Sequence, residues 1–396
     1  MRVLKKGAQK LLIFSIILAV ITPHCVHALD KIDKYSKSSI LMDQGTGRVL
    51  YEKEPDEKRP LASLSKMMTF LIAIEAIENK EVNANDIVKI DKDMAKVKGS
   101  SYHLKEGEEV PLIELMKGLM IVSGNDASIG IAKHICKDEK TFVERMNKKA
   151  KEIGMINTSF VNPNGLPIYN LSDPKAQPKQ NISTARDIAV LAKYMLDNYE
   201  KQVISITDMS TYSNPQRGFV KNNTNALLRI IPEVDGIKTG YTGNAGYCLS
   251  FSMKIKKNED NEKDRRVIGV VLGANHKDKR TSAALSILEH AKKDFKSETV
   301  VQKDELIGKK YIKHINDLEV TLVAEDELYA VLNKEEKLKS QITFKELTYP
   351  IKKGDVLGVI KYYTDNGEIL GSINIVSAND VNDVSIINKI KMLLSE

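Results

Sequence analysis

The chain has 396 residues, 42% of them hydrophobic, and a formal net charge of +7 at pH 7. This length and apolar content are enough for about two packed domains. Because the histidines and cysteines lack zinc-site spacing and no basic stripe is interleaved with aromatic residues, we expect no metal, no cofactor and no nucleic-acid partner.

Residues 1–28 have the pattern of a signal peptide. Basic residues precede the apolar stretch 11–21, and Val26-His27-Ala28 is a small-residue cleavage site. The stretch is too short to span a bilayer, although an uncleaved anchor remains an alternative. Removing residues 1–28 takes away four positive charges and no acidic ones, so the formal charge changes from +7 to +3. We predict a secreted protein of the extracytoplasmic cell envelope.

Residues 29–296 mix strand and helix patterns, which predicts one catalytic domain. Strands near 38–43 and 48–53 flank Gly45-Thr46-Gly47, a hairpin turn rather than a phosphate loop. Apolar periodicity predicts further strands near 235–242, 246–255 and 265–273, and helices near 62–79, 111–121, 126–136, 139–153, 183–198 and 281–295. Strands at both ends with helices between them predict an α/β (α+β) fold, in which helices flank one antiparallel sheet.

The expected helix 62–79 carries the motif Ser63-Leu64-Ser65-Lys66. A serine and a lysine three residues apart lie on the same face of a helix, so the amine can take the proton of the hydroxyl. The helix is apolar nearly all round, which predicts that it is buried and that burial favours the neutral, basic form of Lys66. The alternative for this pair alone is a surface lysine beside a capping serine.

A second motif, Ser123-Gly124-Asn125, lies between two helical patterns and is predicted to be a loop. Such a loop can offer a hydroxyl that relays protons and a carboxamide that holds a peptide group. Taken alone, the same three residues are explained by ordinary turn chemistry.

The third motif, Lys238-Thr239-Gly240, lies on or beside a predicted strand. Its glycine has no side chain, so a substrate backbone can approach and pair along the strand edge. Lys238 would supply positive charge for an anionic substrate.

The pattern changes after about residue 300. Alternating apolar residues and the hairpin turn Asp365-Asn366-Gly367 predict a small all-β domain over 297–378. This segment contains none of the three motifs, so we expect it to act as a spacer or to bind a partner. Residues 379–396 have the pattern of a short amphipathic helix, for which peripheral membrane attachment and capping of the domain are open alternatives.

With these motifs in this order, the chain from about Ser39 to Phe295 resembles the low-molecular-weight penicillin-binding proteins that are serine-type D-alanyl-D-alanine carboxypeptidases. The resemblance implies hydrolysis of the terminal D-Ala-D-Ala bond of peptidoglycan stem peptides through an acyl-enzyme, with a role in cell-wall maturation and cell shape. It also implies inhibition by β-lactams and attachment of some members to the outer face of the cytoplasmic membrane. The flanking segments that share the likeness are 99–102, 123–127, 162–166 and 235–246.

By this resemblance, Ser63 is the nucleophile, Lys66 its base and Ser123 a proton relay. The backbone amides of Ser63 and Tyr241 would form the oxyanion hole, which stabilises the charge of the tetrahedral stage. The residues that would bind the substrate are Asn125, Lys238, Thr239 and Arg280.

Two positions depart from the family pattern. Leu61 stands where many members have proline, and Asn181 stands where members often have histidine, after a segment 166–181 that is longer than usual. These departures bear on loop geometry and substrate preference rather than on the chemistry. The alternatives to a carboxypeptidase are a β-lactamase or transpeptidase of the same superfamily and a non-catalytic wall-binding protein.

Overall fold

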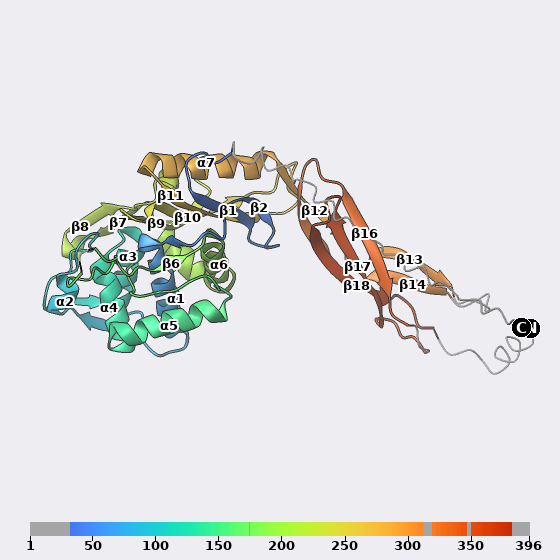
Figure 1. Ribbon diagram of the computed structural model, residues 1–396. Helices are drawn as coiled ribbons and strands as arrows, with labels where there is room; N and C mark the ends of the chain where they lie inside the picture. The colour runs from blue at the N-terminus through green and yellow to red at the C-terminus, as the bar shows by residue number, and fades with distance from the viewer. Residues whose placement is uncertain (1–31, 174, 312–318, 347–349, 382–396) are drawn as a thin grey trace, which may run out of the picture.

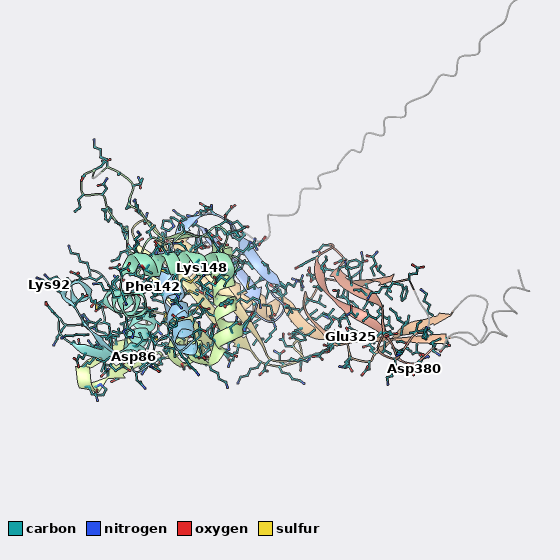
Figure 2. The ribbon with its side chains drawn as sticks, turned by 90° about the horizontal axis from the view of Figure 1, so that it is seen from below. Asp86, Lys92, Phe142, Lys148, Glu325 and Asp380 are labelled. Carbon is teal, nitrogen blue, oxygen red and sulfur yellow. The ribbon has the colours of Figure 1, made fainter. Side chains whose placement is uncertain are left out.

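The computed structural model describes residues 32–173, 175–311, 319–346 and 350–381. The predicted signal peptide (1–28) and nearly all of the predicted tail helix (379–396) lie outside the described residues. A larger α/β part and an elongated all-β part lie end to end (Figure 1). Viewed from below, Asp86 and Lys92 lie in the first part, and Glu325 and Asp380 in the second (Figure 2). Among the described helices, none is long and apolar enough to cross a membrane.

A five-stranded antiparallel sheet, in the order β2-β1-β11-β10-β9, organises the larger part. Its position at the end of this order makes β9 an edge strand, so one side of its backbone is not paired within the sheet. The strands are β1 (Ser38–Asp43), β2 (Val49–Lys53), β9 (Val234–Thr242), β10 (Gly246–Ile255) and β11 (Arg265–Ala274).

Helices cover both faces of this sheet (Figure 1). The side chains of β1 alternate between the faces: Ile40 and Met42 join the core of the helical lobe, and Leu41 joins the core beneath α7. This arrangement confirms the predicted fold class. The helices are α1 (Lys66–Glu78), α2 (Lys92–Ala95), α3 (Leu112–Ile121), α4 (Asn125–Cys136), α5 (Glu139–Glu152), α6 (Ala185–Thr207) and α7 (Lys277–Lys293).

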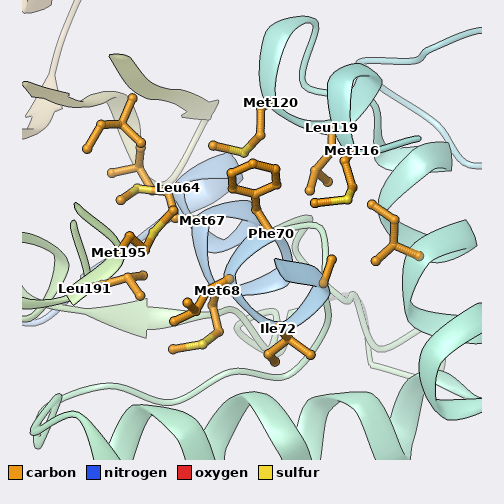
Figure 3. Packing of buried hydrophobic residues seen from close by; sticks show 14 of the residues in the cluster. Leu64, Met67, Met68, Phe70, Ile72, Met116, Leu119, Met120, Leu191 and Met195 are labelled. Carbon is orange, nitrogen blue, oxygen red and sulfur yellow. The ribbon is translucent and has the colours of Figure 1, made fainter. Parts of the chain in front are cut away.

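Helix α1 lies in the centre of the helical lobe. Every residue from Lys66 to Ala76 is buried. Side chains of α3 and α6, among them Met116, Met120 and Met195, surround it (Figure 3). A helix that is apolar all round can be stable only when other elements cover all of its sides. The apolar pattern therefore predicted its position in the core correctly.

Several predicted boundaries were wrong. The expected helix 62–79 begins with a 3₁₀ turn, η2 (Ala62–Ser65), and only then becomes α1. The helix expected over 183–198 continues to Thr207 beyond a kink at Tyr199. The last helix starts four residues early, at Lys277, because the side chain of His276 caps the amide of Asp278. The last two helices are therefore longer than predicted, and the first begins with a tighter turn.

Short pairs of strands were also missed, because two to four residues do not reveal an alternating pattern. The pairs are β3 (Arg59–Pro60) with β6 (Ile182–Ser183), β4 (Ile87–Lys89) with β5 (Glu109–Pro111), and β7 (Thr211–Asn214) with β8 (Phe219–Asn222). Of two further 3₁₀ turns, η3 (Pro215–Arg217) lies between β7 and β8 along the chain, and η4 (Ala226–Arg229) lies between β8 and β9.

The second part is an all-β domain, as predicted. Its five-stranded sheet has the order β13-β14-β18-β17-β16, and β12 pairs with β15 beside it. Gly367, with φ of 91°, forms the expected turn between β17 and β18. The strands are β12 (Phe295–Val301), β13 (Leu306–Tyr311), β14 (Glu319–Ala324), β15 (Leu328–Asn333), β16 (Leu338–Phe344), β17 (Val356–Thr364) and β18 (Ile369–Ser377).

Arg48 joins the two parts. It lies in the turn between β1 and β2, and its side chain is only 7% exposed. The guanidinium is 2.7 Å from both the Glu336 and the Glu368 carboxylates, and it also donates to the Val331 carbonyl. All three acceptors belong to the all-β domain, so this one side chain carries a charged contact between the parts.

We expect Arg48→Ala to lower the free energy of unfolding of the all-β domain by about 1–3 kcal/mol, since it removes hydrogen bonds to charged groups and leaves two carboxylates unpaired. Chemical unfolding, monitored by limited proteolysis, measures this free energy. The control is Arg186→Ala, because Arg186 pairs with Glu52 and Asp56 inside the larger part and is 35% exposed. Its loss should cost less than about 1 kcal/mol. Equal, small effects of both changes would contradict the role of Arg48.

Candidate active site

The first motif brings its serine and lysine together. Ser63 lies in η2 and is partly exposed, whereas Lys66 is the first residue of α1 and fully buried. The distance between Lys66 Nζ and Ser63 Oγ is 2.8 Å. The predicted pairing is therefore correct, although the serine lies in a 3₁₀ turn ahead of the helix rather than on the helix itself.

Lys66 Nζ has two further partners. It is 2.6 Å from Asn125 Oδ1 and 2.8 Å from the carbonyl oxygen of Asn164. Burial, and then the positive charge of Lys238, hold the pKa of Lys66 well below the ordinary lysine value of 10.5. A neutral amine has two hydrogens for the amide oxygens and one lone pair for the serine hydroxyl. This arrangement suits a base.

The contact with Asn164 was not predicted. A backbone carbonyl makes it, and no side-chain pattern reveals a backbone carbonyl. The segment can lie against η2 only because residue 165 is a glycine. An added Cβ there would lie only 1.9 Å from the Ala62 carbonyl oxygen. Gly165 has φ of 87°, which favours glycine as well.

The second motif lies at the start of α4. Asn125 is the first residue of that helix and not part of a loop, a correction to the sequence prediction. Ser123 precedes it with φ of 64° and is 4% exposed. Among the described residues, the Ser123 hydroxyl makes no hydrogen bond to Ser63 or Lys66, so its relay role stays a prediction. Asn125, by contrast, reaches the amine directly.

The third motif lies on the edge strand β9. Lys238 and Thr239 are both buried, and Lys238 Nζ is 3.0 Å from the Thr239 carbonyl oxygen. Burial, and then the positive charge of Arg280, lower the pKa of Lys238 to about 7. The Thr239 hydroxyl lies 2.6 Å from the hydroxyl of Thr224, a residue that sequence reasoning did not identify.

Gly240 lets β9 approach Ser63. A Cβ at this position would be 3.0 Å from the Leu61 carbonyl oxygen and 3.1 Å from the Ser63 nitrogen. The strand therefore passes directly beside the Ser63 amide. The next residue, Tyr241, is 56% exposed and stacks on Tyr247 at 4.2 Å between ring centroids.

Arg280 lies in the first turns of α7 and is 8% exposed. Its guanidinium donates to the Cys248 carbonyl at 3.4 Å and lies 6.0 Å from the centroid of the Tyr247 ring. Its Nε has no hydrogen-bond partner among the described residues. A buried guanidinium with a spare donor can bind an anion. In the described part of the chain, no group of carboxylate, histidine and cysteine side chains has the arrangement of a metal site.

Two protein families match the chain. The family described as D-alanyl-D-alanine carboxypeptidase matches residues 25–276, and the C-terminal domain of penicillin-binding protein 5 matches residues 295–383. The D-alanyl-D-alanine carboxypeptidase DacF of Bacillus subtilis is 33% identical to the chain over 371 residues, which cover 91% of this chain and 90% of DacF.

Solved structures agree. Penicillin-binding protein 5 from Haemophilus influenzae has a TM-score of 0.71 at 28% identity, covering 88% of this chain and 98% of its own. Penicillin-binding protein D2 from Listeria monocytogenes, in a cefotaxime-bound form, has a TM-score of 0.56 at 28% identity, covering 64% of this chain and 96% of its own. The chain belongs to the D-alanyl-D-alanine carboxypeptidase family of penicillin-binding proteins, which are serine hydrolases.

Proposed function

We propose that the chain removes the terminal D-alanine from peptidoglycan stem peptides, with Ser63 as its nucleophile. The observation that carries the proposal is the 2.8 Å approach of a buried lysine amine to the Ser63 hydroxyl. Desolvation keeps that amine neutral, and so able to accept a proton, at a pH where a solvated lysine is already protonated. The family membership supplies the substrate class.

Acylation follows from this geometry. Lys66 takes the Ser63 proton while Oγ attacks the carbonyl carbon of the peptide bond, and the amides of Ser63 and Tyr241 stabilise the resulting oxyanion. Lys66 gives this proton to Ser123, which passes its own proton to the nitrogen of the leaving D-alanine, so the C–N bond breaks, the D-alanine departs and Lys66 is neutral again. Water then attacks the ester, Lys66 accepts the proton of the water and returns it to Ser63 Oγ as the ester bond breaks, and the shortened peptide leaves.

The substrate carboxylate meets positive charge. Lys238, Thr239 and Arg280 would hold it, and Asn125 would hold the preceding peptide group. These roles are supported by the burial of both cations and by the spare Arg280 donor. A β-lactam would acylate Ser63 in the same way, which is the proposed basis of inhibition.

The location of the enzyme is also a proposal. The basic residues and apolar stretch of 1–28 support export to the cell envelope, and the amphipathic pattern of 379–396 supports peripheral attachment to the outer face of the cytoplasmic membrane. The enzyme would then trim the wall from outside the membrane and influence cell shape. A transpeptidase or β-lactamase would share the acyl-enzyme and differ in what accepts the acyl group.

The first prediction is that a labelled penicillin forms its adduct on Ser63, and that Ser63→Ala abolishes labelling. Peptide mapping by mass spectrometry locates the adduct. Ser65→Ala is the matched control: the Ser65 hydroxyl donates to the Ala62 carbonyl at 2.8 Å, away from Lys66, so labelling should persist. An adduct on Ser65 or Ser123, with Ser63 free, would refute the assignment.

A second prediction concerns Lys66. Lys66→Ala should slow acylation by about 100-fold or more, the effect of a positioned general base. In the wild type the rate should rise with pH as Lys66 loses its proton and level off well below the ordinary lysine pKa, and the variant should lack this rise.

The control for Lys66 is Lys238→Ala. It removes the positive charge that lowers the Lys66 pKa, so the rise should persist and move to higher pH. Stopped-flow acylation over a range of pH measures both variants. A Lys66→Ala profile identical to that of the wild type would exclude Lys66 as the base.

A third prediction concerns Arg280. Arg280→Ala should lower kcat/KM on a D-Ala-D-Ala peptide by about 10- to 150-fold, because one charge-assisted contact is lost. Converting the peptide to its C-terminal amide should lower kcat/KM of the wild type by a similar factor. It should lower kcat/KM of the variant much less, since both changes remove the same interaction. An undiminished amide penalty in Arg280→Ala would mean that Lys238 and Thr239 hold the carboxylate without it.

A further inference from the structure

A carboxylate that none of these roles uses lies next to the site. Asp126 is the second residue of α4 and is 1% exposed. Its Oδ1 accepts hydrogen bonds from the amides of Tyr102 (2.8 Å) and Ala127 (2.9 Å). Its Oδ2 accepts from the Ser101 hydroxyl (2.6 Å) and the Leu104 amide (3.1 Å). Three of these donors belong to the segment 98–104, which we call the strap.

The strap in turn holds Asn125. The backbone amide of Asn125 donates to the Ser100 carbonyl at 2.8 Å, and its Nδ2 donates to the Lys98 carbonyl at 2.7 Å. With Nδ2 held there, Oδ1 lies 2.6 Å from Lys66 Nζ. The strap passes so near that a Cβ on Gly99 would be 2.8 Å from Nδ2. The position of the strap therefore determines where the carboxamide oxygen meets the amine.

Asp126 also acts through its charge. Burial lowers the pKa of Lys66 most, the cation of Lys238 on β9 lowers it further, and the carboxylate of Asp126 on α4 raises it. On α7, the nearby cation of Arg280 acts on Lys238. The remaining partners of the Lys66 amine, from Ser63, Asn125 and Asn164, are uncharged. The negative charge of Asp126 thus opposes the effect of the Lys238 cation on the Lys66 pKa.

We propose that Asp126 is a positioning residue for the Ser63 reaction, whose carboxylate holds the strap against α4 and so keeps the Asn125 carboxamide on Lys66. The proposal rests on the function proposed above, because it requires Lys66 to act as the base. A residue that only stabilises the fold would change the melting temperature. A positioning residue with this charge also changes the pH dependence of acylation.

The test is Asp126→Asn, assayed by acylation with a fluorescent penicillin over a range of pH. The change keeps the size of the side chain, removes its charge and replaces one acceptor oxygen with a donor, so at least one strap contact is lost. We expect the plateau rate to fall by about 10- to 100-fold, the effect of losing a hydrogen bond to a charged group. We call the part of the pH profile in which the acylation rate rises the rising limb. We expect this limb to move to lower pH, because loss of the negative charge lowers the Lys66 pKa.

Two further variants separate geometry from charge. Asp126→Glu keeps the charge but displaces the carboxylate, so the plateau should fall while the limb stays near its wild-type pH. Ser101→Ala removes one strap donor and no charge, and it should lower the plateau by a smaller factor without moving the limb. Thermal unfolding establishes which variants are folded.

A folded Asp126→Asn with the wild-type rate and pH profile overturns the proposal. If Asp126→Asn does not fold, Asp126→Glu carries the test, and a wild-type plateau in that variant overturns it. Failure of the wild type to be labelled at Ser63 is a separate result, since it contradicts the proposed function itself.

Discussion

The site depends on one lysine amine that has been removed from water. Lys66 can be buried because α1 is apolar on every side and lies in the middle of the helical lobe. Loss of water would be costly without new partners, and oxygens of Ser63, Asn125 and Asn164 supply them. Each partner comes from a different part of the chain. The lobe therefore has to be assembled before the amine can act as a base.

Two more buried cations, Lys238 and Arg280, would be stabilised by a bound anion. Lys238 and Arg280 lie close enough for Arg280 to lower the pKa of Lys238, and the Arg280 Nε has no partner among the described residues. A carboxylate bound between them would favour the charged form of Lys238. The Lys238 charge lowers the pKa of Lys66, and a carboxylate bound beside Lys238 would offset part of that effect. Under the proposed function, Lys238 would therefore act both on the substrate carboxylate and on the pKa of Lys66.

Sequence reasoning succeeded where the chemistry is local. Spacing along the chain placed Lys66 beside Ser63, and hairpin turns at Gly47 and Gly367 followed from residue type. Contacts between distant segments were not predicted, although segments 99–102 and 162–166 are among those that share the likeness to the family. The Asn164 carbonyl, the Thr224 hydroxyl and the strap reach the site through tertiary packing, and a carbonyl or a loop threonine looks the same in any sequence.

The residue before Ser63 has a backbone conformation that its type does not favour. Ala62 has φ of 47°, in the left-handed region that is costly for a residue with a Cβ. Gly165 on one side and Gly240 on the other approach this turn so closely that neither has room for a side chain. The two segments thus pack tightly against η2 from both sides. Because amides at the start of a helix have no intrahelical acceptor, the Ser63 amide stays available beside β9, where an oxyanion would need it.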